Sequence, residues 1–292
     1  MIAPAAPSTT VEGRWTRLAP FLLVLLAIIL PPIGGGIAKH AAVGHDILGL
    51  AFLRNAISAA ALLLIARPRL RGLTGAQWRA ALGLGAALAV MNATFYLSVT
   101  RLPLGVAVAV EFIGPLTVAM LGGRRWLDFL WPLLALGGVL LLTPLGGATH
   151  LDPLGLFFAA TAGAGWAAYI LTSQKAGQLI PGMTGLALAL TAAALFTAPV
   201  GLMAAGPFLA DAHGVMLVLG VALFSTLLPY MLEYVALRRV PTAVFGILLA
   251  LEPAIAALVG VVGLGERLGL VTWTAIALVC TAALGSSLLR PR

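Results

Sequence analysis

Residues 96–123, YLSVTRLPLGVAVAVEFIGPLTVAMLGG, place a glutamate and a proline inside an apolar run. A shift of 138 positions lays this stretch without gaps on residues 234–261, YVALRRVPTAVFGILLALEPAIAALVGV. The alignment matches Tyr96 with Tyr234, Arg101 with Arg239, Pro103 with Pro241 and Pro115 with Pro253. Half of the 292 residues is 146, so the shift is close to that of a duplicated chain. The sequence therefore predicts two related halves, each with an interrupted helix that carries an acid.

The composition requires lipid around the chain. Apolar residues make up 61% of it and charged residues only 9%, and the mean hydropathy is +1.09. A water-soluble fold of this composition could not cover its surface with polar groups. A helix needs about 20 apolar residues to cross about 30 Å of hydrocarbon. Ten such windows are residues 18–38, 47–66, 80–99, 104–122, 129–146, 154–173, 183–205, 214–236, 243–263 and 269–289. We expect an all-α integral membrane protein whose activity lies within the helix bundle.

The basic residues indicate the orientation in the membrane. If the tail, residues 1–17, is cytoplasmic, thirteen of the 17 lysines and arginines fall on the inner side. Lys39, Arg101 and Arg267 fall on the outer side, and Arg54 lies inside a window. This is the positive-inside bias, which predicts that both termini are cytoplasmic. The net charge of +8 then reflects topology, and no nucleic-acid partner is expected.

The first window has two unusual features. It is preceded by basic residues and followed by small ones, as a cleaved secretory signal would be, but it is long for a signal core and its removal would leave nine spans. It also contains Pro31 and Pro32 followed by three glycines, which predict a break in the helix. The break is interpreted either as a packing kink with close helix approach or as a cavity wall.

The fourth and ninth windows each carry one acid. Glu111 lies near the centre of residues 104–122, and Glu252 lies at the centre of residues 243–263. Pro115 and Pro253 predict helix breaks, because each proline removes the donor for a carbonyl four residues earlier. The alternative interpretation is that each acid is structural and is satisfied by a neighbouring group. We favour a functional role, because an acid, a carbonyl freed by a proline and a position near the midplane coincide in both windows.

Three other windows carry polar or aromatic residues. Arg54 is close enough to the outer boundary for us to expect that its side chain snorkels. Asn92 either ties two helices together or contacts a ligand. Trp166 is too central for an interfacial belt and either walls a cavity or packs between helices. Tyr169 and Tyr230 lie in the sixth and eighth windows.

Neither a metal nor a cofactor is predicted. His40, His45, His150 and His213 fall in predicted outer loops, and nothing in their spacing makes them converge. The single cysteine, Cys280, excludes an internal disulfide. No hydrolase, zincin or nucleotide-binding motif is present, so the sequence does not predict an enzyme.

The two halves, residues 18–146 and 154–289, contain five windows each. An odd number of spans turns the second half upside down in the membrane. Inverted-topology repeats of this kind place the substrate site near the midplane, between discontinuous helices, and work by rocking one bundle against the other.

The chain resembles the ten-span exporters of the drug/metabolite transporter superfamily, of the EamA type, and within it the bacterial threonine/homoserine exporters. The resemblance rests on VAVAVEFIGPLTVAMLGGRRWLDF at residues 106–129, GAGWAAYILTSQKAG at 163–177 and STLLPYMLEYVALRRVPTAVFGILLALEPAIAALVGVVGLGE at 225–266. It implies a bacterial inner-membrane exporter of amino acids with broad specificity, neutral ones such as threonine and homoserine above all. The aromatic amino-acid exporters share this plan, and that branch stays open.

A zwitterionic amino acid requires an anion, donors and a surface for its side chain. We hypothesise that Glu111 and Glu252 meet the ammonium, together with freed carbonyls, and that Asn92 or broken-helix amides meet the carboxylate. Trp166, Tyr169 and Tyr230 would line the side-chain space. Proton coupling through either acid is a further hypothesis.

One alternative stays open, and two are disfavoured. A drug or nucleotide-sugar carrier on the same fold is the runner-up. A membrane-embedded enzyme is disfavoured, because it would need a nucleophile and base near the central acids and the histidines fall in predicted outer loops. A channel is disfavoured, since one chain with two midplane acids lacks a ring of filter groups. We expect a monomer.

Overall fold

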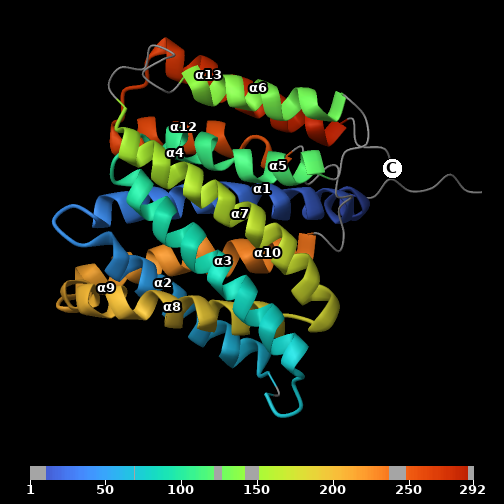
Figure 1. Ribbon diagram of the computed structural model, residues 1–292, viewed down its shortest axis with the longest axis vertical. Coiled ribbons are helices and arrows are strands. Elements are labelled where there is room, and N and C mark those ends of the chain that lie inside the picture. Colours follow the sequence, from blue (N-terminus) through green and yellow to red (C-terminus); the bar gives the residue numbers. More distant parts are fainter. Residues whose placement is uncertain (1–10, 69, 122–126, 142–150, 237–247, 289–292) are drawn as a thin grey trace, which may run out of the picture.

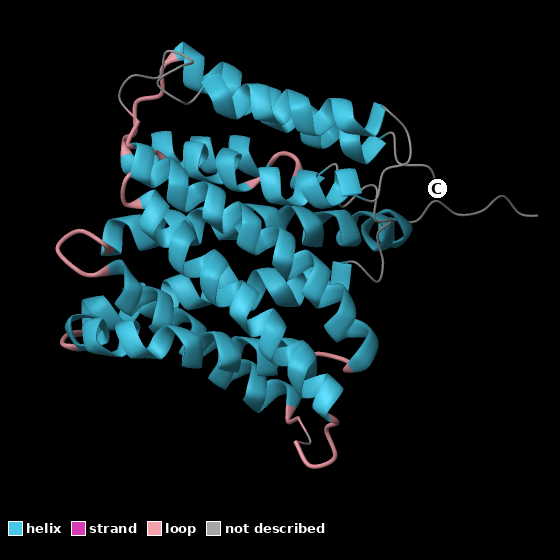
Figure 2. Ribbon diagram, in the orientation of Figure 1, coloured by secondary structure: helices cyan, strands magenta, loops and turns pink. Residues whose placement is uncertain are grey.

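The computed structural model describes residues 11–288 apart from 69, 122–126, 142–150 and 237–247, and every regular element in them is helical (Figures 1 and 2). Arg239 and Pro241 of the predicted repeat, and His150, lie outside this description. The elements are α1 (Val11–Ala41), α2 (Ile47–Ala66), α3 (Gly75–Val99), α4 (Leu104–Glu111), α5 (Ile113–Leu121), α6 (Leu127–Leu141), α7 (Pro153–Leu179), α8 (Thr184–Leu209), α9 (Ala212–Ala222), the π-helical turn η2 (Leu223–Leu227), α10 (Leu228–Ala236), α12 (Glu252–Leu264) and α13 (Leu270–Leu288).

The helices are those of a multi-pass membrane protein. Six segments are long and apolar enough to cross a bilayer: Leu22–Ala41, Ile47–Ala66, Gly75–Val99, Pro153–Leu179, Thr184–Leu209 and Ala212–Leu232. Leu104–Val118, Glu252–Leu264 and Leu270–Gly285 are shorter apolar helices. Large apolar side chains point outward, with Met203 88% exposed and Val262 84% exposed. Lipid is the solvent that such a surface requires.

Helix α1 runs through the middle of the bundle (Figure 1). It contacts α9, η2 and α10 on one side and α12 on the other. Helix α2 packs on α8, α3 packs on both α7 and α8, and α6 pairs with α13 at the top of the view. The short helix α4 lies between α7 and α12, and α5 lies between α7 and α6. Figure 2 shows the loops gathered at two opposite ends of the helices, so the chain crosses back and forth between two faces.

Short polar side chains start several of the helices. Asp46 accepts a hydrogen bond from the Leu48 amide at the start of α2, and Asp211 accepts one from Gly214 at the start of α9. Thr74 and Gln77 form a reciprocal capping box at the start of α3. These caps satisfy amides that a helix cannot satisfy itself. They therefore fix where the apolar segments begin.

The first helix does not break at Pro31 and Pro32 as predicted, because α1 is continuous from Val11 to Ala41. Neighbouring helices support a membrane helix whose prolines have removed donors. A Cβ at Gly34 would lie 2.8 Å from the Ser225 amide nitrogen, so η2 packs directly on the α1 backbone. The glycines thus serve close packing rather than an irregular bend.

Small residues let other pairs of helices approach equally closely. A Cβ on Gly85 of α3 would lie 2.5 Å from the Ala192 Cβ and 2.6 Å from the Ala189 carbonyl oxygen of α8. Such contacts are typical of membrane helices, whose association depends on packing because lipid is as apolar as their side chains. Gly83 on the same helix has open space where a Cβ would be.

These two glycines give a matched test of the packing. We expect Gly85→Ala to destabilise the protein by about 1–3 kcal/mol, because the added methyl overpacks the α3–α8 contact. Gly83→Ala should leave stability unchanged or raise it by up to about 1 kcal/mol through helix propensity. Thermal unfolding in detergent, followed by tryptophan fluorescence, measures both. Equal midpoints for the two variants would contradict the packing described for α3 and α8.

Candidate functional site

A polar cavity of about 110 Å³ lies where α1, α2, α3, α4, α7, η2, α10 and α12 meet. It brings together all six residues that the sequence predicts for substrate contact, Asn92, Glu111, Trp166, Tyr169, Tyr230 and Glu252. Its other lining residues are Ala27, Pro31, Pro32, Arg54, Met91, Phe95, Val108, Ser225, Pro229 and Leu249. The volume is enough for several waters or one small molecule.

The two acids lie at interruptions of the helices. Glu111 is the last residue of α4, and a turn at Phe112 separates it from α5. Glu252 is the first residue of α12, after a turn at Ala250 and Leu251. Both side chains are buried, at 6% and 9% exposure. Each carboxyl group thus lies close to the start of the next helical piece, where the helix dipole favours negative charge.

Glycines hold the first interruption against α7. A Cβ on Gly163 would lie 2.8 Å from the Glu111 carbonyl oxygen. A Cβ on Gly114 would collide with the Gly163 carbonyl. The backbone around Glu111 therefore touches the α7 backbone directly, and this contact fixes the position of the acid relative to Trp166.

Arg54 is the cavity residue that sequence reasoning misjudged. It does not snorkel to the membrane boundary, since only 4% of it is exposed. Its Nη1 donates a 2.8 Å hydrogen bond to the hydroxyl of the buried Tyr96, and its guanidinium lies 5.2 Å from the centre of that ring. Glu111 is within electrostatic range of both Arg54 and Glu252. The position of a charged residue inside an apolar window was the sequence signal for a role of Arg54 in the cavity. The depth of a residue in the membrane, however, does not reveal which way its side chain turns.

Asn92 lines the cavity and also joins two helices. Its Nδ2 donates a 3.3 Å hydrogen bond to Oδ1 of Asn55, which links α3 to α2. Asn92 therefore ties two helices together and also lies where it could contact a ligand. Three buried polar atoms near this link, Arg54 Nε, Asn55 Nδ2 and Ser225 Oγ, have no hydrogen-bond partner among the described residues. Such groups are costly in a protein interior and are suited to a polar ligand or ordered water.

Aromatic rings form one wall of the cavity. Trp166 meets Phe112 edge-on, with ring centres 5.4 Å apart. Tyr169 and Tyr230 stack with their centres 6.1 Å apart and their planes inclined by 26°. Trp166 thus both lines the cavity and packs between helices, against Phe112, the turn residue that follows α4.

A turn of π-helix, which the sequence did not predict, lies next to the two tyrosines. In η2 the Leu228 amide donates to the Leu223 carbonyl, five residues earlier. Pro229 follows at once and cannot donate to Ser225. Single π turns occur frequently at functional sites. Here the turn brings Ser225 into the cavity lining, and Pro229 inside an apolar window was the available signal.

A polar cluster joins three elements at the left-hand end of the bundle in Figure 1. Lys39 Nζ, near the end of α1, lies 2.6 Å from Glu266 Oε1 and also donates to the Leu102 carbonyl at 2.6 Å. Glu266 accepts the Leu104 amide at the start of α4. The cluster therefore links α1, α4 and the α12–α13 connection.

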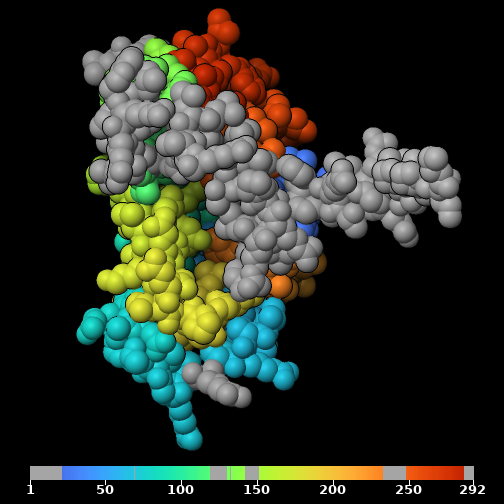
Figure 3. Space-filling model, turned by 90° about the vertical axis from the view of Figure 1, so that its right-hand side faces the viewer, coloured from blue at the N-terminus to red at the C-terminus, as the bar shows by residue number. Residues whose placement is uncertain are grey.

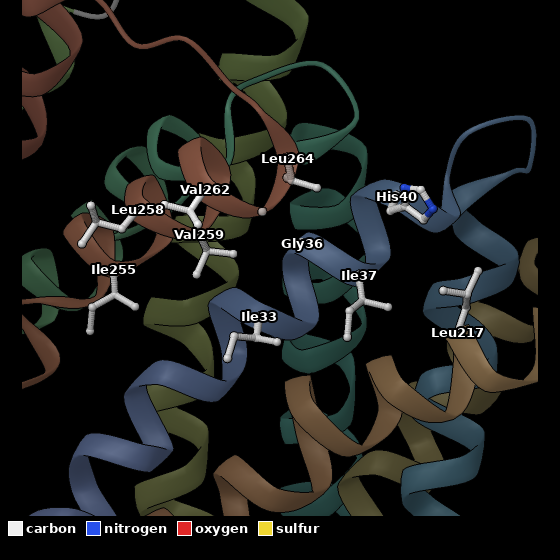
Figure 4. A pocket seen from close by; sticks show the side chains of 11 residues that line it. Ile33, Gly36, Ile37, His40, Leu217, Ile255, Leu258, Val259, Val262 and Leu264 are labelled. Atoms are coloured by element: carbon white, nitrogen blue, oxygen red, sulfur yellow. The ribbon is translucent and has the colours of Figure 1, made fainter.

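A second, larger hollow of about 590 Å³ lies between α1, α9 and α12 (Figure 4). It is lined by aliphatic side chains such as Ile33, Ile37 and Val262, with His40 at one end. His40 belongs to the last turn of α1 rather than to a loop as predicted. An aliphatic groove cannot pair the charges of a polar ligand. The smaller, polar cavity is therefore the candidate site.

Comparisons with known proteins identify the family of the chain. Residues 153–288 match the model of the EamA-like transporter family. The threonine/homoserine exporter RhtA of Escherichia coli (strain K12) is 39% identical over 270 residues, covering 92% of this chain and 91% of the relative. RhtA of Salmonella typhimurium (strain LT2) is 40% identical with the same coverage. A solved structure, titled only "Crystal structure of protein", shares the fold with a TM-score of 0.65 at 18% identity, over 94% of this chain and 99% of that one.

The cluster around Glu266 yields a prediction with an internal control. Lys39→Met should destabilise the protein by about 1–3 kcal/mol, because a poorly exposed carboxylate loses its cation. Thermal unfolding should detect this as a lower midpoint.

The control is the Arg101–Asp152 pair at the same end, which is 3.0 Å long and much more exposed. The hydrogen bond from Arg101 lowers the pKa of Asp152. Its small contribution is thus present above the ordinary aspartate pKa of about 3.9 and lost as the pH falls through the lowered value. At pH 7, Arg101→Gln should leave the midpoint nearly unchanged. A larger effect for Arg101→Gln than for Lys39→Met would contradict the assigned burial.

Proposed function

Since the chain belongs to the EamA-like transporter family, we propose that it exports threonine, homoserine and related amino acids from the cell by alternating access. The observation that carries this proposal is that two buried acids, an arginine and an aromatic wall line one and the same cavity. A zwitterion with a small side chain requires this combination of groups. The aromatic wall is also compatible with the hypothesis that aromatic amino acids are transported.

We propose ten crossings arranged as two inverted repeats. The shift of 138 residues carries α1, α2, α3, α5 and α6 to residues 149–179, 185–204, 213–237, 251–259 and 265–279. These ranges overlap α7, α8, α9 to α10, α12 and α13. Equivalent helices also make equivalent contacts. The contact of α3 with α7 in one direction of the exchange corresponds to that of α9 and α10 with α1, and the contact of α5 with α7 corresponds to that of α12 with α1. In Figure 1 the chain runs leftward along α1 and rightward along α7, which supports the inversion.

The cavity lining supports the same symmetry. Under the shift Met91 pairs with Pro229 and Asn92 with Tyr230. Pro31 pairs with Tyr169, and Glu111 with Leu249. All eight of these residues line the cavity. We infer that the pseudo-two-fold axis passes through it, as expected for a site from which both faces of the membrane are reached in turn.

We propose that both termini are cytoplasmic in the bacterial inner membrane. Helix α1 starts and α13 ends at the right-hand end of Figure 1. Figure 3 looks onto that end, where the α2–α3 connection protrudes at the bottom. Arg67, Arg71 and Arg79, in and near this connection, are exposed. Exposed arginines at one end are typical of the cytoplasmic side.

Within the site we assign the substrate ammonium to the carboxyl groups of Glu111 and Glu252. Trp166, Tyr169 and Tyr230 would contact the side chain. A cavity of about 110 Å³ is below the roughly 300–1,000 Å³ typical of sites for larger ligands. A nucleotide sugar, the runner-up substrate, is therefore disfavoured.

Glu111→Gln tests the ammonium assignment, because it removes the charge and keeps the shape. We expect efflux of labelled threonine from proteoliposomes to fall by about tenfold or more, as for the loss of a hydrogen bond to a charged group. Asp211→Asn is the control, since it changes an exposed acid outside the cavity to another good helix cap. Unchanged efflux in Glu111→Gln would reduce that glutamate to a structural role.

Proton coupling is a separate proposal. Two carboxyl groups and one guanidinium share the cavity, so a proton taken up by one acid could exchange with the substrate ammonium. We expect an imposed pH gradient to change the rate of threonine efflux in the wild type and to have a smaller effect in Glu111→Gln. If the gradient leaves wild-type efflux unaltered, the protein is a facilitator.

A further inference from the structure

The cavity contains one charged group for which the assignments above leave no role. Arg54 lies within α2, is 4% exposed and lines the cavity, and its Nε has no acceptor among the described residues. Its Nη1 donates to a neutral hydroxyl, that of Tyr96. Burying a guanidinium is costly unless an anion and hydrogen bonds compensate it. A structural arginine in an apolar bundle would be expected to use all its donors.

We propose that Arg54 binds the carboxylate of the transported amino acid. The guanidinium fork matches a carboxylate with two parallel hydrogen bonds. A bound substrate would supply the acceptor that Nε lacks, while Tyr96 holds the opposite side of the fork. Arg54 thereby takes the role that the sequence left to Asn92 or to amides of the broken helices. This assignment rests on the proposed export of amino acids.

The repeat supports an orienting role for this residue. The shift of 138 pairs Arg54 with Ala192, which does not line the cavity. Four pairs of equivalent positions line the cavity, but among the described lining residues the one cation, Arg54, belongs to the first half. A zwitterion has two different ends, and a fully symmetric site could not distinguish them. Arg54 on α2 and the acids on α4 and α12 therefore give the substrate one orientation.

The consequence is selection against amines. A molecule with the ammonium and side chain of threonine but no carboxylate would leave the buried Arg54 Nε without an acceptor. The protein should therefore discriminate threonine from threonine amide, which has the same shape and no negative charge. This discrimination distinguishes a contact with substrate from a contribution to packing alone.

The test is competition against labelled threonine in proteoliposomes. In the wild type we expect threonine amide to compete about tenfold less well than threonine, or worse. In Arg54→Gln the half-saturating concentration of threonine should rise by about tenfold while that of the amide changes little, so that the preference disappears. Arg54→Lys should keep part of the preference, since it retains the charge and loses the fork.

The outcomes separate this proposal from the function on which it rests. A wild type that moves no amino acid would refute the proposed function. If the wild type moves threonine and the amide competes equally well, Arg54 is not a carboxylate anchor, and no variant is needed to conclude this. A preference that survives unchanged in Arg54→Gln would overturn the proposal too. Asp211→Asn, which changes an exposed acid outside the cavity, serves as the control and should keep the preference for threonine.

Discussion

The absence of water from the bilayer core controls this structure. Every backbone amide and carbonyl there must find a partner within the protein, so a helix can be interrupted only where the freed groups face protein or a wet cavity. Both interruptions adjoin the same cavity, one between α4 and α5 and the other before α12. The position of the site thus follows from the positions of the breaks.

Close packing makes these interruptions rigid. At the first break the α7 backbone lies directly against the α4–α5 backbone, through Gly114 and Gly163. On the other side of the cavity, α1 receives η2 at Gly34. Small residues therefore do more than bring helices together. They set the distances between acids, arginine and rings that come from five or more separate segments, so the site depends on helix packing rather than on a loop.

The sequence predicted which residues share a cavity better than it predicted the course of individual helices. The depth of Glu111 and Glu252 follows from counting along apolar windows, and six predicted residues do share one cavity. Counting does not reveal which way a side chain turns, so Arg54 was expected to snorkel although it is buried beside Tyr96. Local propensity also failed at Pro31 and Pro32, where neighbouring helices keep α1 continuous. The π turn before Pro229 packs against α1 at Gly34, and Pro229 was the one signal for it within its own segment.

With the proposed inverted repeats, the exporter must expose the same cavity first to one side of the membrane and then to the other. Breaks at α4–α5 and before α12 leave each half with short pieces that can shift without unfolding a complete span. Such a movement must alter the cluster in which Glu266 links the ends of α1 and α4, since this cluster joins the two halves at one end of the bundle. In the conformation described, these contacts are made. An opening of the cavity toward this end of the bundle would therefore require the contacts of Glu266 with Lys39 and with the Leu104 amide to break.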